Sequence, residues 1–205
     1  MTVETARGRY AASRLVLTPG PWTPDLLADL GLPLEVTRRV LCWFQPPGGV
    51  EAFLPSRFPI YIWQRNATEE VYGFPAVDGP RGGVKAAFCH QPKPEVVTPE
   101  TVDRRIRLED VADLQSALGE VLPGLMGPCM QARVCLYPTT PDRHFVLCSH
   151  PRHPQVSVAA GFSGHSYKFC SVVGEILADL AMEGGTRHDL SLYVPKRFRT
   201  ETPYP

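Results

Sequence analysis

The chain has 205 residues, of which 43% are hydrophobic, 20% charged and 9% aromatic. This composition is sufficient for one compact domain or two small lobes with a hydrophobic core. Lys and Arg together number 21, as do Asp and Glu, so the formal net charge is zero. Such a balance gives no electrostatic reason to expect nucleic acid or an anionic membrane as the main partner.

No run approaches the roughly 20 continuous apolar residues that span a bilayer, and the start MTVETARGRY lacks the apolar stretch of a signal peptide. A cytoplasmic protein is therefore expected. The six cysteines include no CxxC pair and are interpreted as reduced thiols. Cys89-His90 and Cys148-x-His150 match no usual pattern of zinc ligands, so no metal site is predicted.

The first elements of the chain are two short predicted strands, Thr2–Thr5 and Arg14–Thr18, with a turn at Gly8 between them. A short helix is predicted over Thr23–Leu30, capped by its first residue and ended by Gly31. A free-standing domain rarely opens with a buried strand that has no partner sheet, so this start is expected to be the last piece of something larger.

The middle of the chain is rich in β-branched and aromatic runs bounded by Pro, Gly and Asn, a pattern typical of strands. The predicted strands are Glu35–Phe44, Ile60–Gln64, Val71–Phe74 and Val84–Phe88. Two helices are predicted next. One is short, over Pro99–Arg105, and the other covers Glu109–Val121, where apolar residues recur at helical spacing.

The last third contains three predicted strands, Ala132–Tyr137, His144–Leu147 and Val156–Ala160. The glycine-containing turn Gly161–His165 follows, and then a helix capped by Ser171 and stopped by Gly184-Gly185. A buried strand that leads through glycines to a helix start is a general site for anions and dipoles. Many such turns, however, need glycine only for the backbone conformation, so the turn alone leaves both interpretations open.

Longer motifs connect the chain to a known family. The segment AAGFSGHSYKF at 159–169 resembles the C-terminal flavin-binding segment of the monomeric sarcosine oxidase and N-methyltryptophan oxidase family. The segment CLYPTTPDRHF at 135–145 is similar to the family pattern Cys-x-Tyr-x-x-Thr-x-Asp-x-His-Phe, and Leu17–Trp22 looks like its strand into a Gly-x-Trp motif. His150-Pro151 and the tail around Asp189 and Arg197 fit as well, so the resemblance covers nearly the whole chain.

The resemblance implies an α/β fold in which the substrate lobe is α+β. Residues 1–33 would end an FAD-binding domain, 34–131 would form a strand-rich substrate-binding domain, and 132–205 would supply the C-terminal strands and last helix of the Rossmann-like FAD-binding domain. The G-x-G-x-x-G turn that holds a dinucleotide pyrophosphate has no counterpart, because Gly79-x-x-Gly82-Gly83 lacks its spacing. The N-terminal part of that domain is thus expected to be missing from this sequence.

The implied function is FAD-dependent oxidation of a secondary N-methyl amino acid, with O₂ reduced to H₂O₂ and the imine product hydrolysed. The partners would be the small amine and oxygen. Two alternatives stay open: a non-catalytic remnant or binding module, and one part of a split oxidase completed by a separate dinucleotide-binding chain.

Four residues match family positions that act on substrate or oxygen. Lys85 matches the lysine beside flavin N5, which accelerates reoxidation, and Lys168 matches the lysine that pairs with the substrate carboxylate. Tyr72 and Tyr137 match aromatic residues of the substrate pocket. Without the resemblance, Lys85 could equally be a surface lysine at a strand edge, and both tyrosines could be core residues.

For the cofactor, Cys135 matches the cysteine that the family joins through sulfur to the 8α-methyl group of FAD. Read alone, it is a small apolar residue within a strand. The other implied FAD-binding residues are Gly161, Phe162, Ser163, Gly164 and His165 in the turn, and Gly20 in the Gly-x-Trp motif.

Two departures from the family pattern lie near these positions. The family often has a histidine four positions after the lysine, where this chain has Cys89 followed by His90. On a regular strand, a shift by one residue turns the side chain to the other face. Ser166 and Tyr167 replace a common Gly-Phe, which implies a reshaped pocket.

Overall fold

The computed structural model describes residues 1–91 and 93–198, which fall into two units. One unit combines Met1–Val36 with the chain from Tyr137 onward, and the other is Thr37–Leu136. The sequence placed these borders a few residues earlier, after residues 33 and 131, and the assignment of each part to a cofactor or substrate domain stays a prediction. Among the described residues, no helix combines the length and apolar character needed to cross a membrane.

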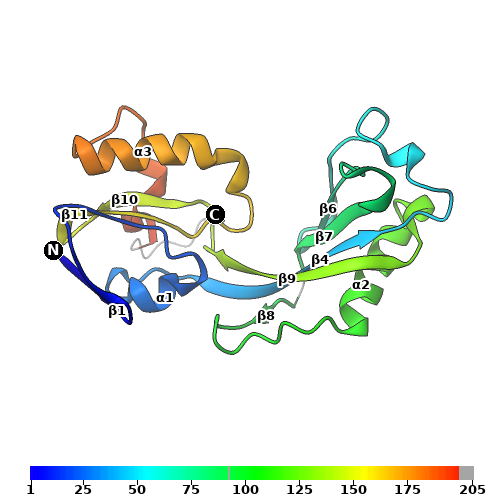
Figure 1. Ribbon diagram of the computed structural model, residues 1–205, viewed down its shortest axis with the longest axis horizontal. Coiled ribbons are helices and arrows are strands. Elements are labelled where there is room, and N and C mark those ends of the chain that lie inside the picture. Colours follow the sequence, from blue (N-terminus) through cyan, green and yellow to red (C-terminus); the bar gives the residue numbers. More distant parts are fainter. Residues whose placement is uncertain (92, 199–205) are drawn as a thin grey trace. The chain divides into compact units, whose positions relative to one another are not determined.

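The first unit contains a hairpin and a three-stranded sheet (Figure 1). Strands β1 (Thr2–Thr5) and β2 (Gly8–Ala11) form the antiparallel hairpin. The sheet has the order β10 (Val146–His150), β11 (His153–Ala160), β3 (Leu15–Leu17). Strand β11 is antiparallel to β10 and parallel to β3, so the sheet is mixed. β2 was not predicted, because its residues lack the β-branched and apolar pattern of a buried strand.

Helices cover both faces of this sheet, as Figure 1 shows. Helix α3 (Cys170–Met182) packs on one face through Val173, Ile176, Leu177 and Leu180. The opposite face is covered by Leu27 and Leu30 from the segment that contains three short helices: η1 (Gly20–Trp22), α1 (Thr23–Leu26) and η2 (Ala28–Leu30). Because side chains alternate along a strand, β11 contributes Val156, Val158 and Ala160 to the second face and Ala159 to the first.

The predicted helix over Thr23–Leu30 is wrong in its extent and its cap. Leu27 leaves the helical conformation and divides the segment into α1 and η2. Trp22 is the N-cap, and the Thr23 hydroxyl donates backward to the Gly20 carbonyl at 2.6 Å. The predicted stop is confirmed, since Gly31 ends η2 in the left-handed conformation.

The predicted cap of the last helix is also wrong. Helix α3 begins one residue before Ser171, and Phe169 occupies its N-cap position. Its predicted end is confirmed, because the helix stops at Met182 and Gly184 follows with a φ of +77°.

The second unit is built on a six-stranded sheet. Its order is β5 (Tyr61–Asn66), β6 (Glu69–Phe74), β7 (Val84–His90), β4 (Glu35–Phe44) and β8 (Glu95–Val96), and β9 (Cys129–Thr139) also pairs with β4. All four strands predicted in the middle of the chain are confirmed, β4 with its predicted bounds. The pairings of β5 with β6, of β6 with β7 and of β7 with β4 are antiparallel.

Helix α2 (Leu108–Gly119), the second predicted helix, packs on the sheet through Leu114, Ala117 and Leu118. The buried partners on the strands are Cys42, Phe44, Val71, Val84, Ala86 and Phe88. The helix predicted over Pro99–Arg105 is wrong. This segment is a turn, in which Thr98 and Thr101 satisfy each other's backbone amides through their hydroxyl groups.

Short 3-10 helices connect the remaining elements. They are η3 (Glu51–Phe53), η4 (Gly79–Arg81), η5 (Pro123–Leu125), η6 (Tyr167–Phe169), η7 (Ser191–Tyr193) and η8 (Pro195–Phe198).

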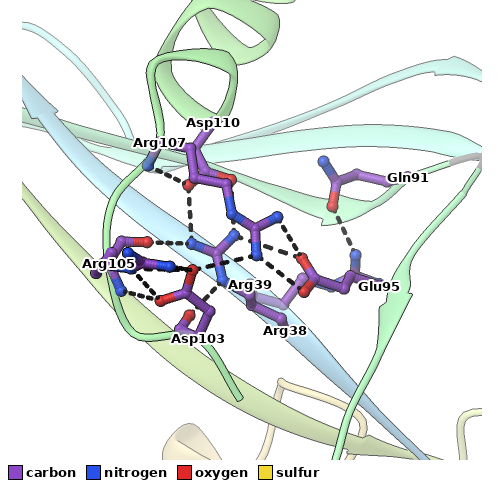
Figure 2. A network of polar contacts seen from close by, with 8 residues as sticks. All are labelled: Arg38, Arg39, Gln91, Glu95, Asp103, Arg105, Arg107 and Asp110. Carbon is purple, nitrogen blue, oxygen red and sulfur yellow. Dashed lines mark hydrogen bonds and ion pairs between the residues drawn. The ribbon is translucent and has the colours of Figure 1, made fainter. Parts of the chain in front are cut away.

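A buried arginine joins β4 to the start of α2 (Figure 2). The Arg38 side chain is only 3% exposed, and its guanidinium donates to both carboxylate oxygens of Asp110, at 2.7 and 2.8 Å. It also donates to the carbonyls of Asp103 and Arg105, at 2.8 and 2.7 Å. Asp110 in turn accepts from the Arg107 backbone N–H at 2.8 Å. This bidentate, charge-assisted arrangement fixes the position of α2 on the sheet.

Candidate functional site

Lys85 lies on the sheet face opposite to α2, where three aromatic rings surround its ammonium group. On β7 it stands directly opposite Trp43 of β4 and Phe74 of β6. Its Nζ lies 4.9 Å from the ring centroid of Phe74, 5.6 Å from that of Tyr72 and 5.7 Å from that of Trp43. Each distance is within the range of a cation–π interaction. The rings therefore hold the ammonium group in place on this face.

The charge of Lys85 is poorly hydrated. Burial lowers the pKa of Lys85, although the neighbouring Cys135 acts in the opposite direction. Across residues 1–91 and 93–198, no carboxylate forms a salt bridge with this lysine. A fixed cation held by rings alone can stabilise negative charge that develops on a bound molecule.

Cys135, on β9, belongs to the same neighbourhood. Burial raises the pKa of the Cys135 thiol, and the cations of Lys85 and Arg104 counteract that rise. The second unit therefore brings together three of the predicted site residues, Lys85, Tyr72 and Cys135. Sequence reasoning missed Trp43 and Phe74, since their contact with the lysine depends on which strands are neighbours.

The glycine turn of the first unit has a closely packed backbone. Gly161, Ser163 and Gly164 all have positive φ, of +61°, +51° and +81°. The buried Ser163 hydroxyl donates to the Gly161 carbonyl at 3.2 Å and accepts from the Thr140 N–H at 3.3 Å. A Cβ on Gly164 would lie 2.2 Å from Cε2 of Tyr137, so the glycine is what allows the Tyr137 ring to pack on the turn.

The other predicted residues of this turn point in different directions. Phe162 packs against Phe145, with ring centroids 4.9 Å apart. His165 Nε2 lies 3.1 Å from the Arg143 carbonyl oxygen, and the exposed Lys168 Nζ donates to the His165 carbonyl at 3.0 Å. The ammonium group of Lys168 is thus solvent-accessible and close to the turn.

Gly20 is separate from these residues along the chain. It begins η1 with a φ of +56°, and a Cβ there would meet no atom within 4 Å. The first unit therefore contains the predicted site residues Tyr137, the turn 161–165, Lys168 and Gly20.

Replacing Gly164 with Ala is expected to lower the free energy of unfolding by about 2–4 kcal/mol, because the new Cβ would be strained at positive φ and overlap the Tyr137 ring. Urea unfolding measures the change. Gly174, inside α3, is the matched control, since its Cβ would meet nothing within 4 Å and Ala is the better helix former by about 1 kcal/mol. Equal effects of the two substitutions would contradict the packing argument.

Comparison with known proteins places this fold in a family. The chain belongs to the family of FAD-dependent oxidoreductases, whose sequence profile matches residues 1–180. Its sequence is 48% identical over 196 residues to the monomeric sarcosine oxidase of Streptomyces avermitilis, which covers 95% of this chain and 50% of that protein. It is 33% identical over 204 residues to the N-methyl-L-tryptophan oxidase of Salmonella arizonae, covering 97% and 51%.

The solved structures agree with this assignment. NikD, an amino acid oxidase essential for nikkomycin biosynthesis, superposes with a TM-score of 0.73 at 26% identity over 95% of this chain and 51% of that one. The chain spans about half the length of the curated relatives it matches. The predicted family, that of FAD-dependent oxidoreductases, is confirmed, and the chain has the fold of the corresponding part of FAD-dependent oxidases.

Proposed function

We propose that this chain carries most of the substrate lobe and part of the flavin lobe of an oxidase that acts on secondary N-methyl amino acids. The substrate class is that of sarcosine or N-methyltryptophan, the compounds after which the two related oxidases are named. The amine is oxidised to an imine, O₂ becomes H₂O₂, and water hydrolyses the imine to an aldehyde and a primary amine. The observation that carries the proposal is Lys85, held by three rings and close enough to Cys135 for the charge of each to affect the other.

FAD fits the chemistry of these residues. When bound, it accepts the electrons of the amine and passes them to oxygen. Cys135 is proposed as the residue to which the flavin is joined, because it matches the family's flavin-linked cysteine. Burial raises the pKa of its thiol, and the Lys85 cation counteracts that rise, which supports the nucleophilic thiolate. The turn 161–165 and Gly20 offer backbone groups that can approach a ligand closely, since glycines supply the positive φ.

The side chains around the amine have separate roles. Lys85 supplies positive charge where electrons reach oxygen, and its desolvated surroundings strengthen that effect. Lys168, exposed beside the turn, binds the substrate carboxylate. Tyr72 of the second unit and Tyr137 of the first each match an aromatic residue that, in the family, keeps water from the amine.

A complete flavin site also needs a dinucleotide-binding segment with the G-x-G-x-x-G turn, which these 205 residues do not contain. We propose that this Rossmann-like segment joins the first unit, either as part of a longer chain or as a separate polypeptide. The cytoplasmic location expected from the sequence stays a prediction.

The purified chain is expected to take up FAD when a dinucleotide-binding segment is co-expressed with it, and the yellow colour is expected to stay with the acid-precipitated protein. Visible absorption of the pellet measures covalent attachment. Cys135→Ala should release the flavin into the supernatant, whereas Cys170→Ala, at an exposed cysteine on α3, should not.

Each outcome of this experiment is informative. Flavin that stays with the Cys135→Ala pellet would contradict attachment at this residue. A chain that stays colourless after incubation with FAD, with and without the co-expressed segment, would overturn the proposal that it belongs to an active oxidase.

A further inference from the structure

A β-bulge in β7 places three possible metal ligands side by side. The register pairs Glu70 of β6 with His90 and Val71 with Phe88, so Cys89 is the extra residue of the bulge. Cys89 and His90 thus both oppose Glu70. The regular alternation of side chains is interrupted here, which corrects the expectation that Cys89 and His90 point to opposite faces.

The three ligand atoms are spaced like those around one ion. Cys89 Sγ lies 3.7 Å from His90 Nε2, and Glu70 Oε1 lies 4.0 Å from the same nitrogen. All three atoms lie within 4.8 Å of one another. From usual zinc–ligand bond lengths, ligand atoms of a tetrahedral zinc ion are about 3.3–3.6 Å apart. The observed separations are wider than this, so the Glu70 side chain would have to move inward by up to about an ångström when an ion binds.

The geometry favours coordination over a catalytic relay. In a nucleophile–histidine–carboxylate relay, the nucleophile and the carboxylate use different ring nitrogens. Here the thiol and the carboxylate approach the same nitrogen, Nε2 of His90. Three donor atoms within 4.8 Å of one another favour a metal site over a proton path. The side chains of His90 and Glu70 are 17% and 20% exposed, so an ion can enter from solvent.

We propose that Glu70, Cys89 and His90 bind a divalent cation of the zinc class, with water as the fourth ligand. A thiolate and an imidazole select zinc-like ions over Mg²⁺ or Ca²⁺, which prefer oxygen. The thiolate and the carboxylate together balance the charge of the ion. Binding requires that the Cys89 thiol lose its proton to solvent, so it tightens as pH rises.

The site has a defined position on the sheet. On β6, Glu70 and Tyr72 are two residues apart and share a face, the face on which Tyr72 contacts the Lys85 ammonium. The proposed ion therefore lies on the same side of the second unit as the candidate active-site lysine. The proposal itself does not depend on flavin binding or on oxidase activity.

Titration of the purified chain with Co²⁺, a spectroscopic substitute for Zn²⁺, tests the site. One equivalent should give the near-ultraviolet thiolate-to-cobalt absorption band, and Zn²⁺ should displace it. Cys89→Ser should abolish the band, and Glu70→Gln should weaken binding by about 100-fold, since loss of a direct ligand should cost at least as much as loss of an outer-shell partner. Cys170→Ser is the matched control, because this exposed cysteine on α3 should leave the titration unchanged.

A measurement on the unmodified chain guards against a variant that fails to fold. Zn²⁺ should protect Cys89 from alkylation, read peptide by peptide, and should leave the exposed Cys170 reactive. Absence of the cobalt band, a band that survives Cys89→Ser in a folded variant, or equal alkylation of Cys89 with and without Zn²⁺ would each overturn the site.

Discussion

Replacing Asp110 with Ala is expected to lower the free energy of unfolding by about 3–5 kcal/mol, which would make it among the most damaging single changes in the second unit. The reason is that the buried Arg38 guanidinium loses its main carboxylate partner. Arg38 is 3% exposed and Asp110 14% exposed. The substitution leaves the buried guanidinium with two carbonyl acceptors and with Glu95, 3.8 Å away, as its remaining counter-charge. Urea or thermal unfolding of the purified variant measures the loss.

A matched control separates burial from charge pairing as such. Glu120 pairs with Arg65 at the surface, where its side chain is 56% exposed. Glu120→Ala should cost less than about 1 kcal/mol, because exposed ion pairs are well solvated. If Asp110→Ala costs no more than Glu120→Ala, the ion pair does not anchor α2 to the sheet.

The same pair should make the unit sensitive to acid. Burial acts to raise the pKa of Asp110, but the hydrogen bonds and charges of Arg38 and Arg107 outweigh it, and the pKa is lowered from 3.8. A carboxyl whose pKa is depressed by folding stabilises the protein fully above its unfolded pKa and loses that contribution as pH falls through its folded pKa. The stability of the wild type should therefore decline below about pH 4 more steeply than that of Asp110→Asn.

Local patterns were enough to predict most of the secondary structure. The alternating apolar residues of Glu35–Phe44 define β4, and the helical spacing in Glu109–Val121 locates α2. The Arg38 network could not be predicted in this way. An arginine within a strand ordinarily indicates a solvent-facing position, and its partner Asp110 follows 72 residues later in the chain. Only the packed sheet and helix bring the two together.

In the candidate site too, some residues are predictable from local sequence motifs and others depend on the packing of strands. Motifs predict Lys85 and Cys135 as site residues. The structure places both in the second unit, where the charge of each shifts the pKa of the other. The rings of Trp43 and Phe74 were missed because they contact Lys85 across strands. The orientation of His90 was mispredicted for a related reason: a bulge is a property of the paired strands, and the sequence of one strand does not reveal it.

Lys85→Met is expected to slow the reaction of the reduced, flavin-loaded protein with oxygen by about 10²–10³-fold, the usual cost of removing one preorganised electrostatic group. This prediction rests on the proposed oxidase function. The methionine keeps the apolar contacts with the rings of Phe74 and Tyr72 but removes the charge. Stopped-flow measurement separates the two half-reactions, and reduction by the amine should change far less than reoxidation.

Two comparisons decide whether charge at this position is the cause. Lys93→Met removes an exposed lysine of the same unit and should leave reoxidation unchanged, whereas Lys85→Arg keeps a cation and should restore part of the rate. Because burial lowers the pKa of Lys85 and the charged form is the active one, reoxidation in the wild type should decline as pH rises through a value below 10.5. That decline should be absent from Lys85→Met. Reoxidation of Lys85→Met at the wild-type rate would show that the Lys85 ammonium group has no part in the reaction with oxygen.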